Sequence, residues 1–600
     1  MNLNISHLHQ AYKDKQLTPR KVVEDILQQS ADYAEHNIWI HQLSLQELEP
    51  YLVQLESQSM DDLPLYGVPF AIKDNIDLAG IPTSAACKEF IYTAEKSAFV
   101  VEQLIKAGAI PLGKTNMDQF ATGLVGVRSP EPWGACKNAF NKEYISGGSS
   151  SGSAVAVALG LASFSLGTDT AGSGRVPASF NNLVGLKPSK GLLSMSGVVP
   201  ACRSLDCVSI FALTTDDANA VLEQAAQYDV EDQYARAIPY ENNLRQYGLP
   251  QGAFTFAVPK AEQLEFFANE SARKLFDESV NMMQSLGGIK QEIDFSLFLD
   301  AAKLLYEGPW VAERYIAIED IITQQPEALL PVIKTIIGSA ETKTAMDAFK
   351  AEYQMQVYRV KSKEILKEFD FLLTPTAGTI YTMDEVNADP IQLNSNLGYY
   401  TNYMNLLDCS CVAVPAGYLD NGLPWGISLV SAAMTDRKLL AYANRWQQAL
   451  KLQPGKADFA LPVSSVENVS YNDTISVIVC GAHLQGLPLN WQLTERGAVL
   501  DAACKTSSNY RMYVIDGDIQ RPGLVRDDES GAAIEIEIWQ MPATAFGGFV
   551  AGIPGPLGIG KVEVSDGRWL PGFICEPYAI DGAKEITQLG GWKPYVASES

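Results

Sequence analysis

The sequence predicts an α/β unit followed by a smaller β-rich α+β unit. Helix and strand patterns alternate from about residue 17 to about residue 460, which is typical of an α/β core. Beyond a segment rich in Pro, Gly, Ser and Asn, the pattern changes to short strands separated by turns. A chain of 600 residues also exceeds one ordinary hydrophobic core, so we expect more than one structural unit.

The first unit begins with a predicted helix near residues 17–35, where Thr18 is a candidate N-cap and Pro19 takes the first helical position. The apolar run in YGVPFAIKDNID (66–77) predicts a buried strand. The segment VEQLIKAGAIPLGKTN (101–116) predicts a helix and then a strand. We assign residues 1–458 to this unit.

The second unit is predicted from four strand-like segments with turn residues between them. These segments are TISVIVCGA (474–482), YRMYVIDG (510–517), AAIEIEIWQM (532–541) and GIGKVEV (558–564). We assign this unit to residues 474–600 and place a linker at residues 459–473, where turn-forming residues are concentrated.

Composition excludes several classes of partner. The formal net charge is −25, which argues against nucleic acid. No run reaches the ~18 apolar residues that a membrane helix needs, so we expect no membrane partner. The N-terminal residues lack the apolar core of a signal peptide, and we expect a cytoplasmic protein. Nine dispersed cysteines without a CxxC pair predict neither a disulfide framework nor a zinc site.

Histidine is scarce, which restricts the available chemistry. The chain has five histidines, and none lies between residues 42 and 482. Catalysis in that span would need another base, and a metal site there would need carboxylates or thiolates alone. We expect no metal and no cofactor.

The most distinctive segment is residues 146–180, where glycine and serine crowd both ends of a run of small apolar residues. The run predicts a tightly packed helix. Ser149 and Ser173 are 24 residues apart, enough for a helix to carry the chain away and a strand to bring it back. We therefore expect two Gly/Ser loops to lie side by side.

These loops indicate a serine nucleophile. Ser173 is the candidate, and a serine hydroxyl is inert unless a base takes its proton. Lys73 follows an apolar strand, where burial would favour the neutral amine that a general base requires. Ser149 can pass the proton between them. Considered alone, however, a Gly/Ser loop is more often a turn or a phosphate cradle, and most lysines are surface charges.

The same loop suggests an oxyanion hole. Glycine allows backbone N–H groups to approach a ligand closely. The N–H groups of four consecutive residues can point at one oxygen, as an oxyanion hole requires. These residues are Thr170, Ala171, Gly172 and Ser173.

Three motifs resemble the amidase signature family: GVPFAIKDNID, GGSSSGSA and GTDTAGSGRVPASFNNLVGLKPSKG. The resemblance covers roughly residues 15–450. It implies a mixed β-sheet core flanked by helices, a triad of Ser173, Ser149 and Lys73, and a cis peptide at Gly148–Ser149. A homodimer is common among enzymes of this kind.

Other segments resemble the allophanate hydrolase branch of that family, above all DQFATGLVGVRSP (118–130) and LLYEGPWVAERYIAI (304–318). The resemblance implies that Tyr306 and Arg314 bind the substrate carboxylate, assisted by the backbone near Gly123. Their spacing of eight residues would place the two side chains on nearly the same face of one helix. The alternative is that Arg314 simply pairs with Glu307 or Glu313.

The C-terminal unit resembles the γ-glutamylcyclotransferase-like domain that accompanies this branch. The implied reaction has two parts: the amidase domain converts allophanate to ammonia and N-carboxycarbamate, and the C-terminal domain then promotes loss of carbon dioxide without a metal. His483 is the candidate residue for the second part, because no other histidine follows residue 41. The alternative is a structural histidine in a turn. A biotin-dependent urea carboxylase is a possible functional partner.

Two other functions are compatible with the triad. One is an amidase acting on simple aliphatic or aryl amides, for which Arg314 would be dispensable. The other is a subunit resembling the glutamine amidotransferase component that charges transfer RNA, which would need protein partners. The segment 304–318 and the C-terminal unit argue against the second.

Overall fold

A computed structural model of the chain describes residues 1–239, 242, 246–247, 252–464, 474–517 and 520–599. The chain divides into two compact units, one comprising Met1–Ile238 with Leu244–Glu467 and the other Pro239–Asn243 with Asn468–Ser600. Most of the predicted linker lies outside the described residues, as residues 465–473. The domain boundaries at 458 and 474 stay predictions.

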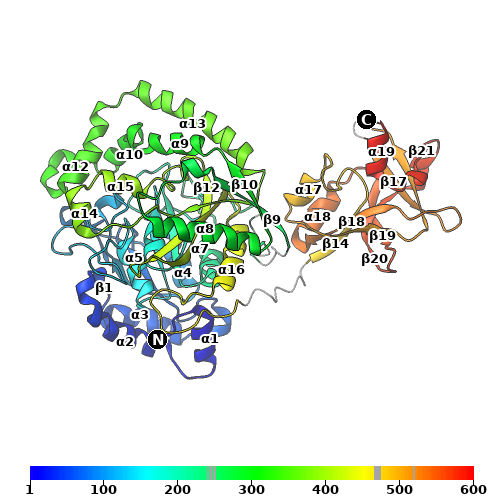
Figure 1. Cartoon of the computed structure of the whole chain (residues 1–600). Coiled ribbons are helices and arrows are strands. Elements are labelled where there is room, and N and C mark those ends of the chain that lie inside the picture. The colour runs from blue at the N-terminus through cyan, green and yellow to red at the C-terminus, as the bar shows by residue number, and fades with distance from the viewer. Residues whose placement is uncertain (240–241, 243–245, 248–251, 465–473, 518–519, 600) are drawn as a thin grey trace. The chain divides into compact units, whose positions relative to one another are not determined.

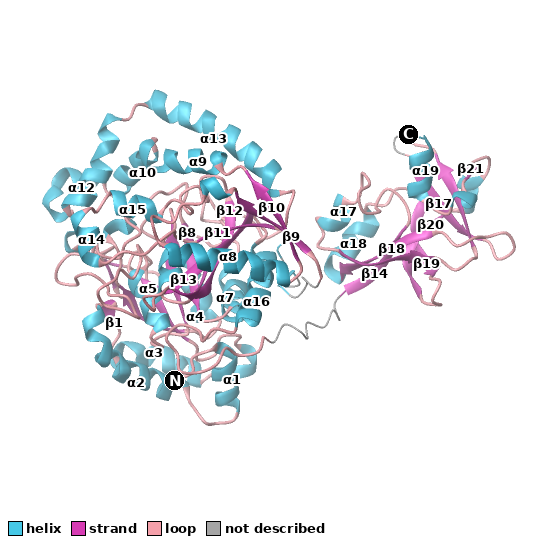
Figure 2. Ribbon diagram, viewed as in Figure 1, coloured by secondary structure: helices cyan, strands magenta, loops and turns pink. Residues whose placement is uncertain are grey.

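The first unit is built on one mixed sheet of 11 strands, which confirms the predicted fold class (Figures 1 and 2). Strand β2 pairs in parallel with β5 and β6, whereas β8 pairs antiparallel with β6 and β7. In sheet order the strands are β1 (Trp39–Gln42), β5 (Ile110–Thr115), β2 (Pro69–Lys73), β6 (Phe164–Asp169), β8 (Cys207–Ala212), β7 (Val184–Lys187), β12 (Cys409–Tyr418), β13 (Pro424–Ala432), β11 (Phe371–Pro375), β9 (Phe254–Pro259) and β10 (Gly288–Ile293).

Helices surround this sheet, as Figure 2 shows. The helix predicted near 17–35 begins as expected, with the Thr18 side chain accepting a hydrogen bond from the Lys21 N–H and Pro19 in the first position. The helices are α1 (Ile5–Lys13), α2 (Pro19–Ser30), α3 (Leu45–Glu56), α4 (Phe99–Lys106), α5 (Ser151–Ala158), α6 (Val176–Phe180), α7 (Thr215–Ala225), α8 (Glu270–Ser285), α9 (Ser296–Glu307), α10 (Trp310–Ala317), α11 (Glu319–Gln324), α12 (Pro331–Gly338), α13 (Ala345–Leu366), α14 (Met383–Ala388), α15 (Gln392–Leu397) and α16 (Asp436–Leu450).

Helix α5 is the predicted helix of small residues, and all its residues are buried. The small side chains let the backbone approach its neighbours closely. A Cβ added at Gly152 would lie 2.3 Å from the Ile38 carbonyl oxygen and 2.6 Å from the Asn116 nitrogen. Helix α5 therefore fits directly against the strands that carry the candidate site, and larger residues would push it away.

The second unit has its own hydrophobic core, which includes Val477, Ile538 and Trp539. One sheet has the order β15 (Val499–Lys505), β18 (Glu535–Pro542), β14 (Thr474–Val479), β20 (Trp569–Cys575) and β19 (Leu557–Glu563). A second has the order β17 (Arg521–Arg526), β16 (Tyr510–Ile515) and β21 (Lys584–Glu585). The helices are α17 (Trp491–Thr494), α18 (Ala543–Ala551) and α19 (Trp592–Glu599). The predicted β-rich α+β character is confirmed.

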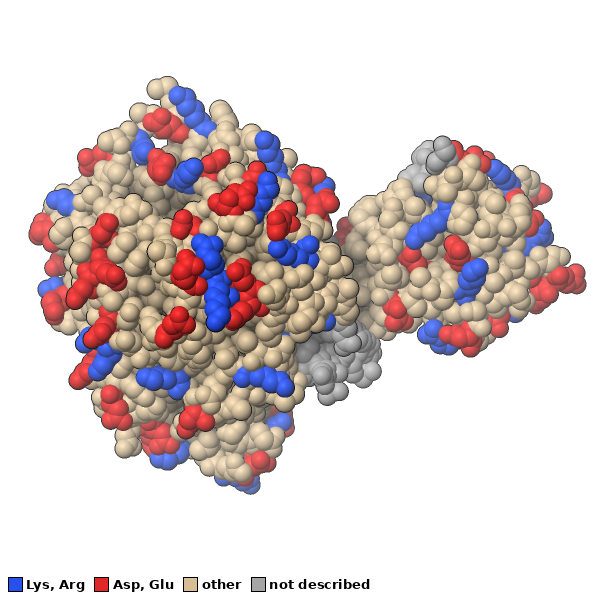
Figure 3. Space-filling view, viewed as in Figure 1, with Lys and Arg blue, Asp and Glu red and all other residues tan. Residues whose placement is uncertain are grey.

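Acidic and basic side chains are interspersed over the visible surface, as Figure 3 shows. In the part of the chain that the structure describes, no helix is both long enough and apolar enough to span a bilayer.

Candidate active site

The two Gly/Ser loops meet, as the sequence predicts. Ser149 lies just before α5, and Ser173 follows β6, the strand that returns beside β2. Ser149 Oγ donates a hydrogen bond to Ser173 Oγ at 3.0 Å, and both side chains are buried. The Gly148–Ser149 peptide bond is cis, as the resemblance implied.

Lys73 completes a chain of three polar groups. It ends β2, is fully buried, and its Nζ donates hydrogen bonds to Ser149 Oγ at 2.7 Å and Thr168 Oγ1 at 2.7 Å. Burial lowers the pKa of the Lys73 amine to about 7, although nearby carboxylates oppose the shift. The amine is therefore substantially neutral near neutral pH, as a general base requires.

A neighbouring lysine shows why Lys73 differs. Lys114 on the adjacent strand β5 is also fully buried, but its Nζ lies 3.2 Å from the Asp74 carboxylate. Among the described residues, no carboxylate lies within ion-pair distance of Lys73. Lys114 is thus tied to a carboxylate, while the hydrogen-bond partners of Lys73 are the hydroxyl groups of Ser149 and Thr168.

A buried ion pair between Arg175 and Asp169 fixes the loop that carries Ser173. Arg175 donates from Nε and Nη2 to the two oxygens of Asp169, both at 2.8 Å, and the Gly174 N–H donates to the same carboxylate at 3.0 Å. Gly172 has φ +148°, and an added Cβ would lie 2.5 Å from Thr401 Oγ1. Only glycine fits this turn without strain.

The turn leaves backbone donors free for a ligand. Within the described segments, the N–H groups of Ala171, Gly172 and Ser173 donate to no protein acceptor. Thr170 is fixed separately, because its Oγ1 donates to Asp206 Oδ1 at 2.5 Å. This arrangement is suited to an oxyanion hole, and the role of these residues stays a prediction.

The predicted carboxylate clamp required a correction. Tyr306 and Arg314 do not share one helix: α9 ends at Glu307, Gly308 and Pro309 interrupt the backbone, and α10 begins at Trp310. Proline lacks the N–H that a continuous helix would need. The two side chains nevertheless meet, with the Arg314 guanidinium 5.4 Å from the centre of the Tyr306 ring.

Arg314 points toward the nucleophile rather than toward a glutamate. Its Nη1 donates to Thr122 Oγ1 at 3.4 Å, and the adjacent Gly123 carbonyl accepts from Ser173 Oγ at 3.4 Å. Glu313 instead accepts a hydrogen bond from Ser204 Oγ at 2.7 Å. The Arg314 Nε is buried and has no partner among the described residues. The guanidinium therefore keeps donors for a ligand carboxylate.

Three residues of the site were not predicted from the sequence. Thr168 anchors Lys73, and its place in the motif beside Ser173 was an available signal. Asp206 holds Thr170 from 36 residues away, and nothing local indicates that contact. Arg128, also buried, donates from Nη1 to the Thr122 carbonyl at 3.0 Å.

Comparison with known proteins shows the family of the chain. The amidase family profile matches residues 21–440. The chain belongs to the amidase family. A second profile, the allophanate hydrolase C-terminal domain, matches residues 475–597.

Relatives of this amidase-family chain include proteins that match both units. It is 43% identical to the urea amidolyase of Saccharomyces cerevisiae over 594 residues, covering 96% of this chain and 32% of that protein. It superimposes on the allophanate hydrolase of Kluyveromyces lactis with a TM-score of 0.75, 40% identity and 98% of both chains covered. A glutamyl-tRNA(Gln) amidotransferase component from Carboxydothermus hydrogenoformans is 32% identical but covers only 65% of this chain. The chain spans about a third of the length of the curated relatives it matches first.

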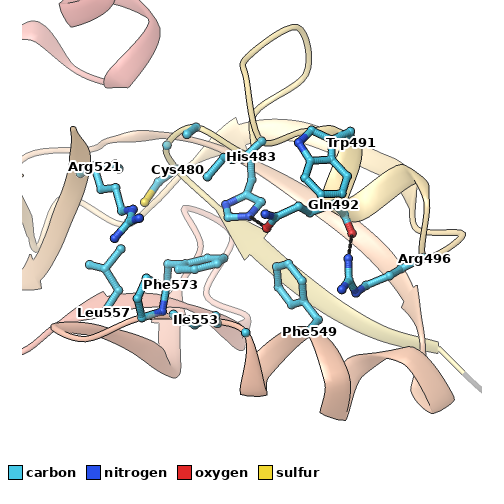
Figure 4. A pocket seen from close by; sticks show the side chains of 16 residues that line it. Cys480, His483, Trp491, Gln492, Arg496, Arg521, Phe549, Ile553, Leu557 and Phe573 are labelled. Atoms are coloured by element: carbon cyan, nitrogen blue, oxygen red, sulfur yellow. Dashed lines mark hydrogen bonds between the residues drawn. The ribbon is translucent and has the colours of Figure 1, made fainter. Parts of the chain in front are cut away.

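His483 lies in the second unit, in a pocket of about 320 Å³ (Figure 4). Its ring stacks on Phe573 with centroids 5.1 Å apart. Its Nε2 lies 2.9 Å from Gln492 Oε1. Because an amide oxygen only accepts, this contact places the hydrogen on Nε2 and leaves Nδ1 free to exchange a proton. Burial lowers the pKa of His483 and so favours the neutral imidazole.

Two arginines flank this histidine and differ in their partners (Figure 4). Arg496 donates from Nη1 to the Gln492 carbonyl at 2.8 Å and to Glu495 Oε1 at 2.5 Å. The Arg521 side chain donates to none of the residues that the structure describes. Burial raises the pKa of the neighbouring Cys480 thiol to about 12, so it stays protonated and is a poor nucleophile.

Proposed function

We propose that the chain is an allophanate hydrolase whose first unit cleaves the terminal amide of allophanate and whose second unit completes the breakdown to ammonia and carbon dioxide. One observation supports the proposal: hydrogen bonds link Lys73 to Ser149, Ser149 to Ser173 and Ser173 to the Gly123 carbonyl. The adjacent residue, Thr122, accepts a hydrogen bond from the incompletely paired Arg314 guanidinium. These contacts join an activated serine to a carboxylate-binding group.

The first step is acyl transfer to Ser173. Neutral Lys73 takes a proton from Ser149, and Ser149 takes one from Ser173 as its oxygen attacks the amide carbon. The N–H groups of the loop from Thr170 to Ser173 stabilise the resulting oxyanion. Ser149 returns a proton to the departing ammonia. Water then hydrolyses the acyl-enzyme by the reverse relay and releases N-carboxycarbamate.

Substrate choice follows from Arg314. Allophanate carries an amide at one end and a carboxylate at the other, and a guanidinium can bind a carboxylate through two parallel hydrogen bonds. The Tyr306 ring packs against the guanidinium and limits its orientation. A substrate held there presents its amide to Ser173.

Replacing Arg314 tests this assignment. We expect Arg314→Gln to lower kcat/KM for allophanate by about 150-fold, which corresponds to the loss of about 3 kcal/mol of charge-assisted hydrogen bonding. Turnover of acetamide, which has no carboxylate, should be unchanged. Ammonia release measures both. Arg273→Gln, on the exposed surface of α8, is the matched control. An equal loss for both substrates would contradict the clamp.

The second unit is the proposed site of decarboxylation. N-carboxycarbamate is a dianion, and it becomes ammonia by losing two carbon dioxide molecules as protons reach the nitrogen. A bound dianion beside His483 would raise the pKa of the imidazole, because opposite charge favours its protonated form. His483 can then deliver the proton from Nδ1. Arg521 is the better placed cation for the ligand, since Arg496 is already occupied by Glu495.

Paired substitutions separate these roles. His483→Gln and Arg521→Gln should leave the first ammonia release unchanged but slow carbon dioxide release by about 100-fold, the size of a general-acid contribution. Arg496→Gln is the matched control. It should slow carbon dioxide release by less than about fivefold, because the charge of Arg496 already has a protein partner. Parallel assays of ammonia and carbon dioxide give the ratio of carbon dioxide release to the first ammonia release. A normal ratio in both His483→Gln and Arg521→Gln would rule out this site.

Three further assignments rest on family resemblance. We propose a cytoplasmic homodimer that receives allophanate from a biotin-dependent urea carboxylase. Light scattering of the purified chain tests the dimer, and a monomer at working concentration would contradict it.

A further inference from the structure

A basic pocket in the first unit has no place in the mechanism above. Its volume is about 390 Å³, which suits a small-molecule ligand. It lies between the segment 190–206, α13 and the Leu407–Asp408 turn. Five cationic side chains line it: Lys190, Arg203, Arg236, Arg359 and Lys363. Such a concentration of positive charge is unexpected in a chain of net charge −25.

The protein neutralises only part of this charge: Arg359 pairs with Glu352 at 2.8 Å, and Arg236 pairs with Asp408. The pocket has two carboxylates, and both are engaged: Asp408 accepts from Arg236 at 2.8 and 3.3 Å, and Asp206 accepts from Thr170 and from two backbone N–H groups. Arg203 and Lys363 are exposed and have no acceptor in the described ranges. The pocket therefore presents an excess of positive charge to solvent.

The environment of Lys190 shows that the positive charges of the pocket lie close together. Its Nζ donates to the Ser204 carbonyl at 3.3 Å. Burial lowers the pKa of Lys190 to about 8; Asp408 opposes the shift, while Arg359, Lys187 and Arg236 add to it. An anion in the pocket would relieve this repulsion.

We propose that this pocket is a second anion-binding site, separate from the Ser173 centre, that takes a small metabolite with two or more carboxylate or phosphate charges. Arginine and lysine together suit such ligands, because guanidinium groups bind oxyanions in pairs and ammonium groups supply point charge. The ligand binds by displacing water from Arg203, Lys190 and Lys363 at the pocket wall.

Residues that line the pocket also contact the loops of the candidate active site. Asp206 lines the pocket and holds Thr170 of the nucleophile loop. Ser204 also lines the pocket, and its Oγ donates to Glu313, the neighbour of Arg314. A ligand that shifts this wall will reach both the oxyanion loop and the carboxylate clamp. Anion binding therefore regulates turnover.

Calorimetric titration of the full chain tests the site without any need for turnover. The probes are inorganic phosphate and citrate, each at constant ionic strength balanced with chloride. We expect saturable binding of one anion per chain, and the tighter probe identifies the preferred charged group. A background of Arg314→Gln with Arg521→Gln removes anion binding at the two sites proposed above, and binding in the basic pocket must persist there.

Variants at the rim locate the binding. Arg203→Gln combined with Lys363→Gln should weaken binding by at least about tenfold, because each removes a charge without a described protein partner. Lys361→Gln, an exposed lysine of the same helix that does not line the pocket, is the matched control and should bind like the parent. Absence of saturable binding, or equal binding by the double variant, overturns the proposal.

Turnover tests the coupling. Ammonia release at saturating allophanate should change by at least about twofold when the tighter anion is added to the parent or to Lys361→Gln, and should not change in the double variant. An unchanged rate in the parent refutes the regulatory role. Because calorimetry is independent of catalysis, failure of the allophanate assay remains distinguishable from failure of the anion site.

Discussion

Ser173→Ala should reduce ammonia release from allophanate by at least about 10,000-fold, the largest effect that we expect of any substitution. The change removes the oxygen that we propose as the nucleophile, while the Ser149–Lys73 pair and the proposed Arg314 clamp remain. Substrate should therefore still bind. Single-turnover kinetics and calorimetric binding of a non-reactive dicarboxylate such as malonate measure the two effects separately.

Ser179→Ala is the matched control for this experiment. Ser179 lies on the adjacent helix α6, is buried, and its Oγ has no hydrogen-bond partner among the described residues. It should retain parental activity. Parental turnover by Ser173→Ala would show that another group is the nucleophile.

Lys73→Met should lower kcat/KM by about 1,000-fold, which is the range of general-base catalysis. The proposed mechanism requires a neutral Lys73, and the pKa of this amine is lowered to about 7. The rate should accordingly rise with pH through about 7 and level off above it. Methionine fills a similar volume and cannot titrate, so the variant should lose both the rate and this ascending limb.

A substitution of a surface lysine is the matched control for Lys73→Met. Lys106→Met, at the exposed end of α4, should keep the parental rate and pH profile. A Lys73→Met variant that keeps the ascending limb would assign the titration to another group. Asp206 and Asp118 are the nearest alternatives, because burial raises the pKa of each carboxyl.

Local sequence signals were sufficient for the secondary structure that carries the site. Thr18 and Pro19 marked the start of α2, and the small residues of 151–158 indicated a closely packed helix. The absence of histidine between residues 42 and 482 indicated lysine as the candidate base. These signals work because caps, periodicity and side-chain size act over a few residues.

The carboxylate clamp shows where such reasoning fails. A spacing of eight residues predicted one helical face for Tyr306 and Arg314, but Pro309 divides the segment into two helices. The side chains still meet because α9 and α10 pack together in the folded unit. The contact between Tyr306 and Arg314 therefore comes from the packing of two helices and not from a shared helical face, and the role of the pair stays a prediction.

The sequence by itself determined the motif residues and the division into an α/β unit and a β-rich unit. Only the tertiary structure decided that Lys73, from β2, faces Ser149 and Thr168, while Lys114 one strand away is tied to Asp74. It alone revealed the Asp206–Thr170 contact and the basic pocket behind it. The reason is physical: pKa shifts and binding pockets arise from burial and from contacts between distant segments, which exist only once the sheet has brought its strands together.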